Sequence, residues 1–339
     1  MRSSKSMAVL LTLLAVASSR AWAQSGTVVD TDFVAEAGTR GAIIWDVRSE
    51  EEYKKGHIPS AVNIDDPQTQ LRDGKTEDYI PIPEMEKILG SAGIDLNKEV
   101  VIYGAKGLPP AYFAQQTLRY LGAERVYVYH GGFDDWRAAG KAVSTEHTRL
   151  PPVPVDATAK KAMLVSTQEV VAKLNDSRVQ IVDARTAKEY SGDDIRALRG
   201  GHIPGAVNIP YEQNWLDPDT PRKLARKQVA NKDGMSLKPK EALKALYAAL
   251  DPAKETIVYC QSGSRASQTA TVLQELGFRD VRIYDGSWLA YGNAFDAPAA
   301  NVSYFNVGRV NGTLNQLQGR IEALEAELEQ LKSQAGKKP

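Results

Sequence analysis

Two segments of this 339-residue chain repeat one pattern, and the repeat constrains the fold more than any other feature. Residues 43–64 read I-I-W-D-V-R-S-E-E-E-Y-K-K-G-H-I-P-S-A-V-N-I, and residues 181–209 repeat this with extra residues before Gly201. The matched pairs are Asp46 and Asp183, Arg48 and Arg185, Glu52 and Glu189, Tyr53 and Tyr190, His57 and His202, Pro59 and Pro204, and Asn63 and Asn208. Two copies of one domain therefore lie end to end.

Short apolar strands alternate with helical stretches in each copy, which predicts an α/β fold. Alternating strands and helices form an open, mainly parallel sheet that is flanked by helices. The expected helices cover residues 83–92, 110–121, 167–174 and 239–249. The predicted architecture is two tandem domains of this kind, followed by a C-terminal coiled-coil helix.

The domain boundaries follow from changes in composition along the chain. Residues 143–164 contain Pro151, Pro152 and Pro154 and lack periodicity, so they are predicted to be an extended linker. The N-terminal domain is expected to span residues 24–142 and the C-terminal domain residues 165–300.

Cys260 is the only cysteine in the sequence, and it lies in a distinctive local setting. An apolar strand ends at Tyr259, a loop of small residues follows, and an amphipathic helix is expected over residues 266–276. Such a loop directs backbone N–H groups and the positive end of the helix at one point. Arg265 adds a charge, and these conditions lower a thiol pKa from about 8.5. We therefore predict a nucleophile, with a buried structural cysteine as the alternative.

The loop C-Q-S-G-S-R-A resembles the active-site loop of the rhodanese sulfurtransferases. Further motifs match in the same order: D-A-R with E-Y, G-H-I-P-G-A-V-N-I-P and Y-D-G-S-W at residues 284–288. The last motif is similar to the tandem-domain thiosulfate and 3-mercaptopyruvate sulfurtransferases, and the resemblance covers about residues 28–298. It implies the rhodanese fold, and sulfur transfer through a persulfide on the cysteine.

The first copy is expected to be catalytically silent. Gly104 stands at the place of Cys260, and Pro109 stands opposite Arg265 in a loop one residue longer. The resemblance implies that this domain forms one wall of the active-site cleft.

The candidate catalytic residues are Cys260 and Arg265. Arg265 is predicted to bind an anionic donor or the leaving sulfite, although a structural ion pair is the alternative. Asp183 and Arg185 recur in the silent copy, which favours a structural role, as it does for His57 and His202. Trp288 lines the cleft or fills the core. The candidate substrate-binding and loop residues are Gln261, Ser262, Gly263, Ser264 and Ala266, and Ser267 is a further donor.

The donor is left open by departures from the closest relatives. Tandem thiosulfate enzymes often carry arginine at the position of Glu189, and basic residues near Gln261 and Ser262. Thiosulfate and polysulfide both remain candidate donors, with a thiol or cyanide as acceptor. No cofactor is implied, and the four histidines are too scattered to suggest a metal site.

Two other functions remain open. A cysteine-loop phosphatase or arsenate reductase also presents N–H groups to an oxyanion, but phosphatase-type members have C-x5-R where this chain has C-x4-R. The second is a non-catalytic persulfide carrier or scaffold, which would hold sulfur but show little turnover with small donors.

The N-terminus predicts export. Arg2 and Lys5 precede an apolar run over residues 7–17, and A-W-A at residues 21–23 fits a cleavage site. We therefore expect a signal peptide over residues 1–23, a periplasmic location and no stable membrane anchor. A net charge of zero, from 42 basic and 42 acidic residues, gives no indication of nucleic-acid binding.

The C-terminal segment 308–335 predicts a coiled coil. Leu314, Ile321 and Leu328 occupy a positions, and Val310, Leu317, Leu324 and Leu331 occupy d positions. In a parallel pairing Arg320 faces Glu325 and Glu327 faces Lys332, which are opposite charges. We expect a homo-oligomer, with a helix docked on its own domain as the alternative.

Overall fold

A computed structural model describes residues 26–335 and confirms the predicted α/β architecture. The N-terminal domain contains the strands β1 (Val28–Val29), β2 (Ile43–Asp46), β3 (Val62–Asn63), β4 (Val100–Tyr103) and β5 (Val126–Tyr129). They form a parallel five-stranded sheet in the order β1-β5-β4-β2-β3. Its helices are α2 (Thr31–Thr39), α3 (Glu50–Lys55), α4 (Pro67–Gln70), α5 (Ile82–Ser91), α6 (Pro110–Tyr120) and α7 (Gly132–Ala138).

The C-terminal domain repeats this plan around a parallel four-stranded sheet. Its strands, in sheet order, are β10 (Asp280–Ile283), β9 (Glu255–Tyr259), β6 (Val179–Asp183) and β8 (Val207–Asn208). Its α-helices are α8 (Thr167–Lys173), α9 (Ala187–Ser191), α10 (Thr220–Ala225), α11 (Lys240–Leu246), α12 (Ser264–Glu275) and α13 (Ser287–Asn293). Short 3₁₀ helices are η1 (Lys161–Met163), η2 (Tyr211–Asn214) and η3 (Asp233–Met235).

The central strands are buried on both faces, and this fixes the position of the loops that follow them. Residues 100–103 and 256–259 are fully buried, which is typical of parallel strands covered by helices. Because the strands of each sheet are parallel, the loops after β6 and β9 leave the same edge. Cys260 follows β9 directly, and it therefore lies at that edge.

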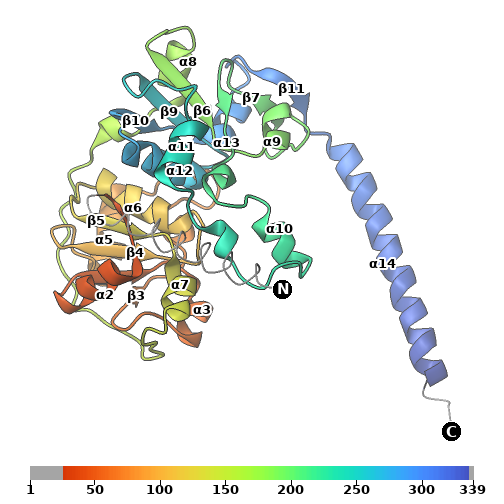
Figure 1. Ribbon diagram of the computed structural model, residues 1–339. Helices are drawn as coiled ribbons and strands as arrows, with labels where there is room; N and C mark the ends of the chain where they lie inside the picture. The colour runs from red at the N-terminus through yellow and green to blue at the C-terminus, as the bar shows by residue number, and fades with distance from the viewer. Residues whose placement is uncertain (1–25, 336–339) are drawn as a thin grey trace, which may run out of the picture.

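The two domains meet through the helices that follow the corresponding central strands. Helix α6 of the N-terminal domain lies against α12 of the C-terminal domain (Figure 1). Gln116 donates a hydrogen bond to Thr271 at 2.8 Å, and Arg119 donates one to Gln274 at 3.0 Å. The helix that begins at the Cys260 loop is therefore part of the domain boundary.

The segment that joins the domains runs along the N-terminal domain as an extended chain. Its backbone N–H groups at Val153, Thr158 and Lys160 donate to carbonyl groups at the ends of α5 and α6. The isolated bridge between Leu164 and Ile283 then leads the chain into the second sheet.

The C-terminal domain extends to Tyr304, beyond the predicted end at residue 300. Strand β11 (Ala300–Tyr304) pairs antiparallel with β7 (Arg199–His202) to form a two-stranded ribbon. Gly200 and Gly201 gave no strand signal, because glycine is depleted in strands. A Cβ at Gly201 would lie 2.2 Å from the carbonyl oxygen of Ala300, so only glycine allows this close pairing.

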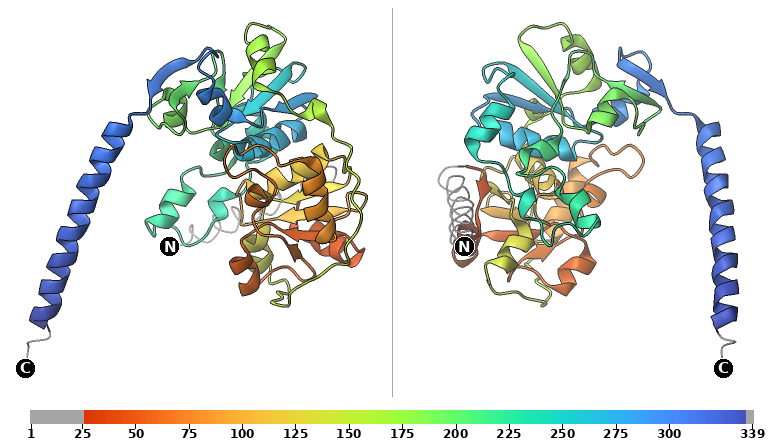
Figure 2. Two further views of the ribbon diagram at one scale, coloured as in Figure 1. Left: turned by 180° about the vertical axis from the view of Figure 1, so that it is seen from behind. Right: turned by 45° about the vertical axis from the view of Figure 1, so that its right-hand side comes forward.

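Helix α14 (Val307–Ala335) begins beyond the ribbon and projects away from both domains (Figure 2). Its predicted a and d side chains are exposed, as shown by values of 56% for Leu314, Ile321 and Leu324. The alternative of a helix docked on its own domain is therefore wrong. In the part of the chain that the structure describes, no helix is long and apolar enough to cross a membrane. The expected signal peptide lies outside the described residues.

Candidate active site

The Cys260 loop runs from the end of β9 to the start of α12 at Ser264, two residues before the predicted helix start. Gly263 has φ +89°, and a Cβ there would lie 2.7 Å from Nη2 of Arg72 and from Oδ1 of Asp285. Both the backbone angle and this close approach therefore require glycine.

The thiol of Cys260 is only 1% exposed. It lies beside the N-terminus of α12, a helix of 12 residues, and the positive end of a helix attracts anions. A sulfur donor therefore reaches the thiol only after neighbouring side chains move.

Ser287 holds the loop in place, and sequence reasoning did not single it out. Its hydroxyl accepts hydrogen bonds from the backbone N–H groups of Cys260 and Gly263, both at 3.1 Å. The same hydroxyl donates to the carbonyl oxygen of Tyr284 at 2.7 Å. Ser287 adopts φ +50°, where the silent domain has Gly132 at φ +55°. A non-glycine residue with this φ often marks a functional site. The corresponding signal in the sequence is a serine at the position where the first copy has Gly132.

Arg265 is engaged by Glu189 rather than free. Its Nη1 and Nη2 atoms donate to the two carboxylate oxygens of Glu189 at 2.7 and 2.8 Å. Burial raises the pKa of Glu189, but the hydrogen bonds and charge of Arg265 outweigh this effect and lower the pKa to about 2. This bidentate geometry is that of a structural ion pair, which the sequence left open as the alternative to anion binding by Arg265.

Arg72 of the N-terminal domain is a second arginine near the loop, and sequence reasoning missed it. It is buried and forms a salt bridge with Asp285, 213 residues further along the chain. Its guanidinium group lies 4.5 Å from the ring centre of Phe113 and 5.0 Å from that of Tyr79. Arg72 packs against the Cys260 loop, because its Nη2 would lie 2.7 Å from a Cβ at Gly263.

The other loop residues have different environments. Gln261 donates from Nε2 to the carbonyl oxygen of Arg196 at 2.7 Å. Within the described chain, Oε1 of Gln261 and Oγ of Ser264 are buried without a hydrogen-bond partner. Ser262 is partly buried, and Ala266 belongs to the core. Ser267 donates to the carbonyl oxygen of Gly263 at 3.0 Å. The unpartnered polar side-chain atoms of the loop are therefore those of Gln261 and Ser264.

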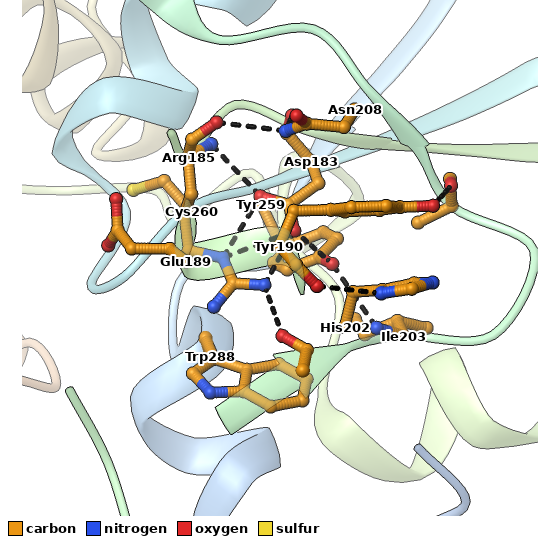
Figure 3. Close-up of polar contacts among 12 residues, drawn as sticks. Asp183, Arg185, Glu189, Tyr190, His202, Ile203, Asn208, Tyr259, Cys260 and Trp288 are labelled. Carbon is orange, nitrogen blue, oxygen red and sulfur yellow. Dashed lines mark hydrogen bonds and ion pairs between the residues drawn. The ribbon is translucent and has the colours of Figure 1, made fainter. Parts of the chain in front are cut away.

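Asp183 and Arg185 form the centre of a buried network behind the loop (Figure 3). Arg185 donates to Asp183 and, at 2.7 Å, to the carbonyl oxygen of Gly201, and Tyr259 donates to Asp183 at 2.6 Å. The ring of His202 stacks on Tyr190 at a centroid distance of 3.6 Å.

The same network recurs in the N-terminal domain. Arg48 pairs with Asp46 and donates to the carbonyl oxygen of Gly56, while Tyr103 donates to Asp46. The ring of His57 stacks on Tyr53 at 3.8 Å. A network present where no cysteine exists supports a structural role for Asp183, Arg185 and His202.

Trp288 packs in the core rather than along an open cleft. Its side chain is 1% exposed, its Nε1 donates to the carbonyl oxygen of Arg199, and Arg185 lies over its ring at 4.5 Å. Its backbone N–H donates to the carbonyl oxygen of Cys260 at 2.9 Å. Trp288 thereby supports the loop from behind.

The loop of the silent domain is covered by a residue of the other domain. A Cβ at Gly107 would lie 2.9 Å from Cβ of Met235. Nε2 of His130 is 2.8 Å from the carbonyl oxygen of Met235, and Lys106 pairs with Asp135 at 2.7 Å. This loop therefore forms part of the domain interface.

Comparisons with known proteins match the arrangement just described. The rhodanese-like domain family matches residues 30–139 and 166–294. A thiosulfate sulfurtransferase of Corynebacterium glutamicum is 34% identical over 258 residues, covering 73% of this chain and 80% of the relative. The sulfur carrier protein TtuD of Thermus thermophilus is 33% identical over 263 residues, covering 73% of this chain and 86% of the relative.

A solved structure shows the same fold at lower identity. The anaerobic ergothioneine biosynthesis enzyme of Chlorobium limicola, in complex with trimethyl histidine, superposes with a TM-score of 0.69 at 22% identity. The match covers 80% of this chain and 69% of that enzyme. From the family match to both domains and the sequence relatives, the chain is a tandem-domain member of the rhodanese family and a sulfurtransferase of the thiosulfate sulfurtransferase type.

Proposed function

We propose that the protein moves sulfane sulfur from thiosulfate or a polysulfide to a thiol or cyanide through a persulfide on Cys260. The observation that supports this most is the cysteine's position, at the start of a loop between β9 and the N-terminus of α12. Arg265 lies in the first turn of α12, and Arg72 packs against the loop at Gly263. The N-terminus of α12 and these charges favour an anionic sulfur before and after transfer.

The reaction has two displacement steps. The Cys260 thiolate attacks the outer sulfur of the donor, the sulfur–sulfur bond of the donor breaks, and its electron pair leaves with sulfite or a thiolate. The acceptor thiolate or cyanide then attacks the outer sulfur of the persulfide, and the Cys260 thiolate is released. Covalent catalysis of this kind divides one difficult transfer into two easier ones.

Thiocyanate formation from thiosulfate or polysulfide and cyanide tests the proposal. The mature protein should turn over, whereas Cys260→Ser should lose activity by at least about a thousandfold. Gly104→Cys in the Cys260→Ser background should stay inactive, because Met235 covers the silent loop. Turnover that survives Cys260→Ser would contradict the mechanism.

A persulfide carrier is the second candidate function. It is favoured by the 1% exposure of Cys260 and by the likeness to a protein named a sulfur carrier. A carrier would form a persulfide detectable by mass spectrometry after one equivalent of donor, yet would release sulfur slowly to cyanide. Multiple turnovers per Cys260 would exclude this reading in favour of an enzyme.

Export to the periplasm and self-association complete the proposal. The charged and apolar residues before A-W-A at residues 21–23 support export, and N-terminal sequencing of the secreted product should find Gln24 first. The exposed heptad residues of α14 support a homo-oligomer that forms through this helix.

A further inference from the structure

Two arginines beside the Cys260 loop, Arg265 and Arg72, are paired with buried carboxylates. The Arg265 side chain is 14% exposed and its partner Glu189 is 2% exposed. The Arg72 side chain is 4% exposed and its partner Asp285 is 13% exposed. Each of these two guanidinium groups therefore has a carboxylate partner. Glu189 also lies 3.3 Å from Arg196, whose side chain is 51% exposed and so screened by solvent.

The ion pair with Glu189 occupies both Nη atoms of the Arg265 guanidinium group. Both Nη atoms point at Glu189, and this is the bidentate geometry in which arginine would otherwise hold an oxyanion. Glu189 is held in place by its own helix, because it also accepts hydrogen bonds from Thr186 in the capping box of α9.

This arrangement discriminates between donors by charge. Thiosulfate is a dianion and leaves as sulfite, so its transition state requires uncompensated positive charge close to the sulfur. A hydropersulfide, R–S–SH, carries at most one negative charge on its reacting sulfur atoms and leaves as a single thiolate. A site whose arginines are paired with carboxylates stabilises a departing thiolate nearly as well as a cationic site does. It stabilises departing sulfite much less.

We infer that Glu189, acting through Arg265, makes this site selective for organic hydropersulfides over thiosulfate. The inference rests on the proposed persulfide chemistry of Cys260. In the favoured step the Cys260 thiolate attacks the terminal sulfur of R–S–SH, the S–S bond breaks, and the electron pair leaves on R–S⁻. The proton stays on the transferred sulfur, so the products are the Cys260 hydropersulfide and one thiolate.

The test compares kcat/KM for thiosulfate and for 2-hydroxyethyl hydropersulfide, an uncharged small donor, with cyanide as acceptor and Cys260→Ser as the blank. The wild type should favour the hydropersulfide by at least about tenfold. Glu189→Gln should raise kcat/KM for thiosulfate about tenfold and change that for the hydropersulfide less than about twofold. Glu189→Asp keeps the charge and should keep the wild-type preference.

Glu52→Gln is the matched control, because Glu52 is the exposed counterpart of Glu189 in the silent domain and should leave both donors unaffected. A Glu189→Gln variant that folds and slows both donors equally would show a structural role only. If that variant does not fold, the inference is tested by the wild-type kcat/KM values for the two donors. A higher kcat/KM for thiosulfate than for the hydropersulfide overturns it. Absence of cysteine-dependent turnover with either donor would instead overturn the proposed function.

Discussion

Arg72 of the N-terminal domain and Asp285 of the C-terminal domain form a buried salt bridge beside the Cys260 loop. Burial raises the pKa of the Asp285 carboxyl group, and Arg72 opposes that rise. Arg72 also donates to the carbonyl oxygen of Glu77, so the pair ties the segment after α4 to the loop that precedes α13. The N-terminal domain thereby contributes a charged group beside the Cys260 loop of the C-terminal domain.

Removal of Arg72 should destabilise the protein more than removal of an exposed arginine. Arg72→Met leaves Asp285 buried without its partner, which costs about 3–5 kcal/mol. Arg40→Met, which breaks the exposed pair with Glu99, should cost less than about 1 kcal/mol. Urea unfolding measures both values.

The double variant Arg72→Met with Asp285→Asn should recover a large part of the lost stability, because no unpaired charge remains. Equal losses for Arg72→Met and Arg40→Met, or no recovery in the double variant, would show that the pair contributes little.

The Ser287 hydroxyl should be required for activity because it orients two N–H groups of the Cys260 loop. Ser287→Ala removes the acceptor and keeps the unfavourable φ, and should lower stability by about 1–3 kcal/mol. Ser287→Gly removes the acceptor but relieves the backbone, so its stability loss should be smaller by about 1 kcal/mol. Both variants should lower kcat by at least about tenfold.

Ser303→Ala is the control for Ser287, because the Ser303 hydroxyl lies in the ribbon and donates to the carbonyl oxygen of Gly192, at the end of α9, at 2.6 Å. It should lose stability to a similar extent while sulfur transfer stays at the wild-type rate. Activity that falls only in proportion to the unfolded fraction of Ser287→Ala would argue against a role in the loop.

Local patterns in the sequence predict the parts of the fold that depend on local interactions. The strand, loop and helix around Cys260 follow from apolar strand residues before it and helical periodicity after it. The heptad pattern likewise predicts a helix over residues 308–335, and α14 spans Val307–Ala335. Both elements are set by neighbouring residues, so periodicity is sufficient to find them.

Contacts between distant residues leave no such pattern. The partner of Arg72 lies 213 residues away, and a single arginine in a loop does not indicate a salt bridge across domains. The departure at Glu189 was visible in the sequence, yet its bidentate contact with Arg265 depends on how α9 packs beside the loop. The ion pairs of the site could therefore be found only once the fold was known.

Stability should fall with acid in a window set by His130. Its Nε2 donates to the carbonyl oxygen of Met235, and its Nδ1 lies 2.7 Å from the hydroxyl of Tyr112. Burial lowers the pKa of His130 from 6.5 to about 4. The unfolded chain therefore takes up a proton before the folded protein does, and stability is lost as the pH falls from about 6.5 to about 4.

The loss from His130 should be on the order of 3 kcal/mol, measured by urea unfolding at several pH values. Glu189, whose pKa is about 2, contributes only below about pH 4.5. Buried carboxyl groups with a raised pKa, such as Asp285, act in the opposite sense, so the histidine contribution is the difference between the wild-type profile and that of the variant. His130→Gln keeps a donor for Met235 and should flatten the profile between pH 6.5 and 4.5. His147→Gln, at an exposed position, should leave the slope unchanged, and an unchanged slope in His130→Gln would refute the assignment.

Helix α14 should assemble the protein through its heptad seam. Ile321 is 56% exposed at an a position, and burial of such a side chain on association gains about 1.5–3 kcal/mol. Ile321→Glu also places like charges in the seam, so self-association should weaken at least about a hundredfold. Ala326→Glu adds the same charge at the outward f position and should leave the oligomer intact.

Light scattering after size-exclusion chromatography measures the mass of each variant. The Ile321→Glu variant should be a monomer with unchanged activity per Cys260, because α14 projects away from the domain that holds the cysteine (Figure 2). A wild type that is monomeric at micromolar concentration would contradict assembly through the coil. Equal masses for Ile321→Glu and the wild-type oligomer would place the interface elsewhere on the protein, since a charge in the seam is incompatible with a packed coil.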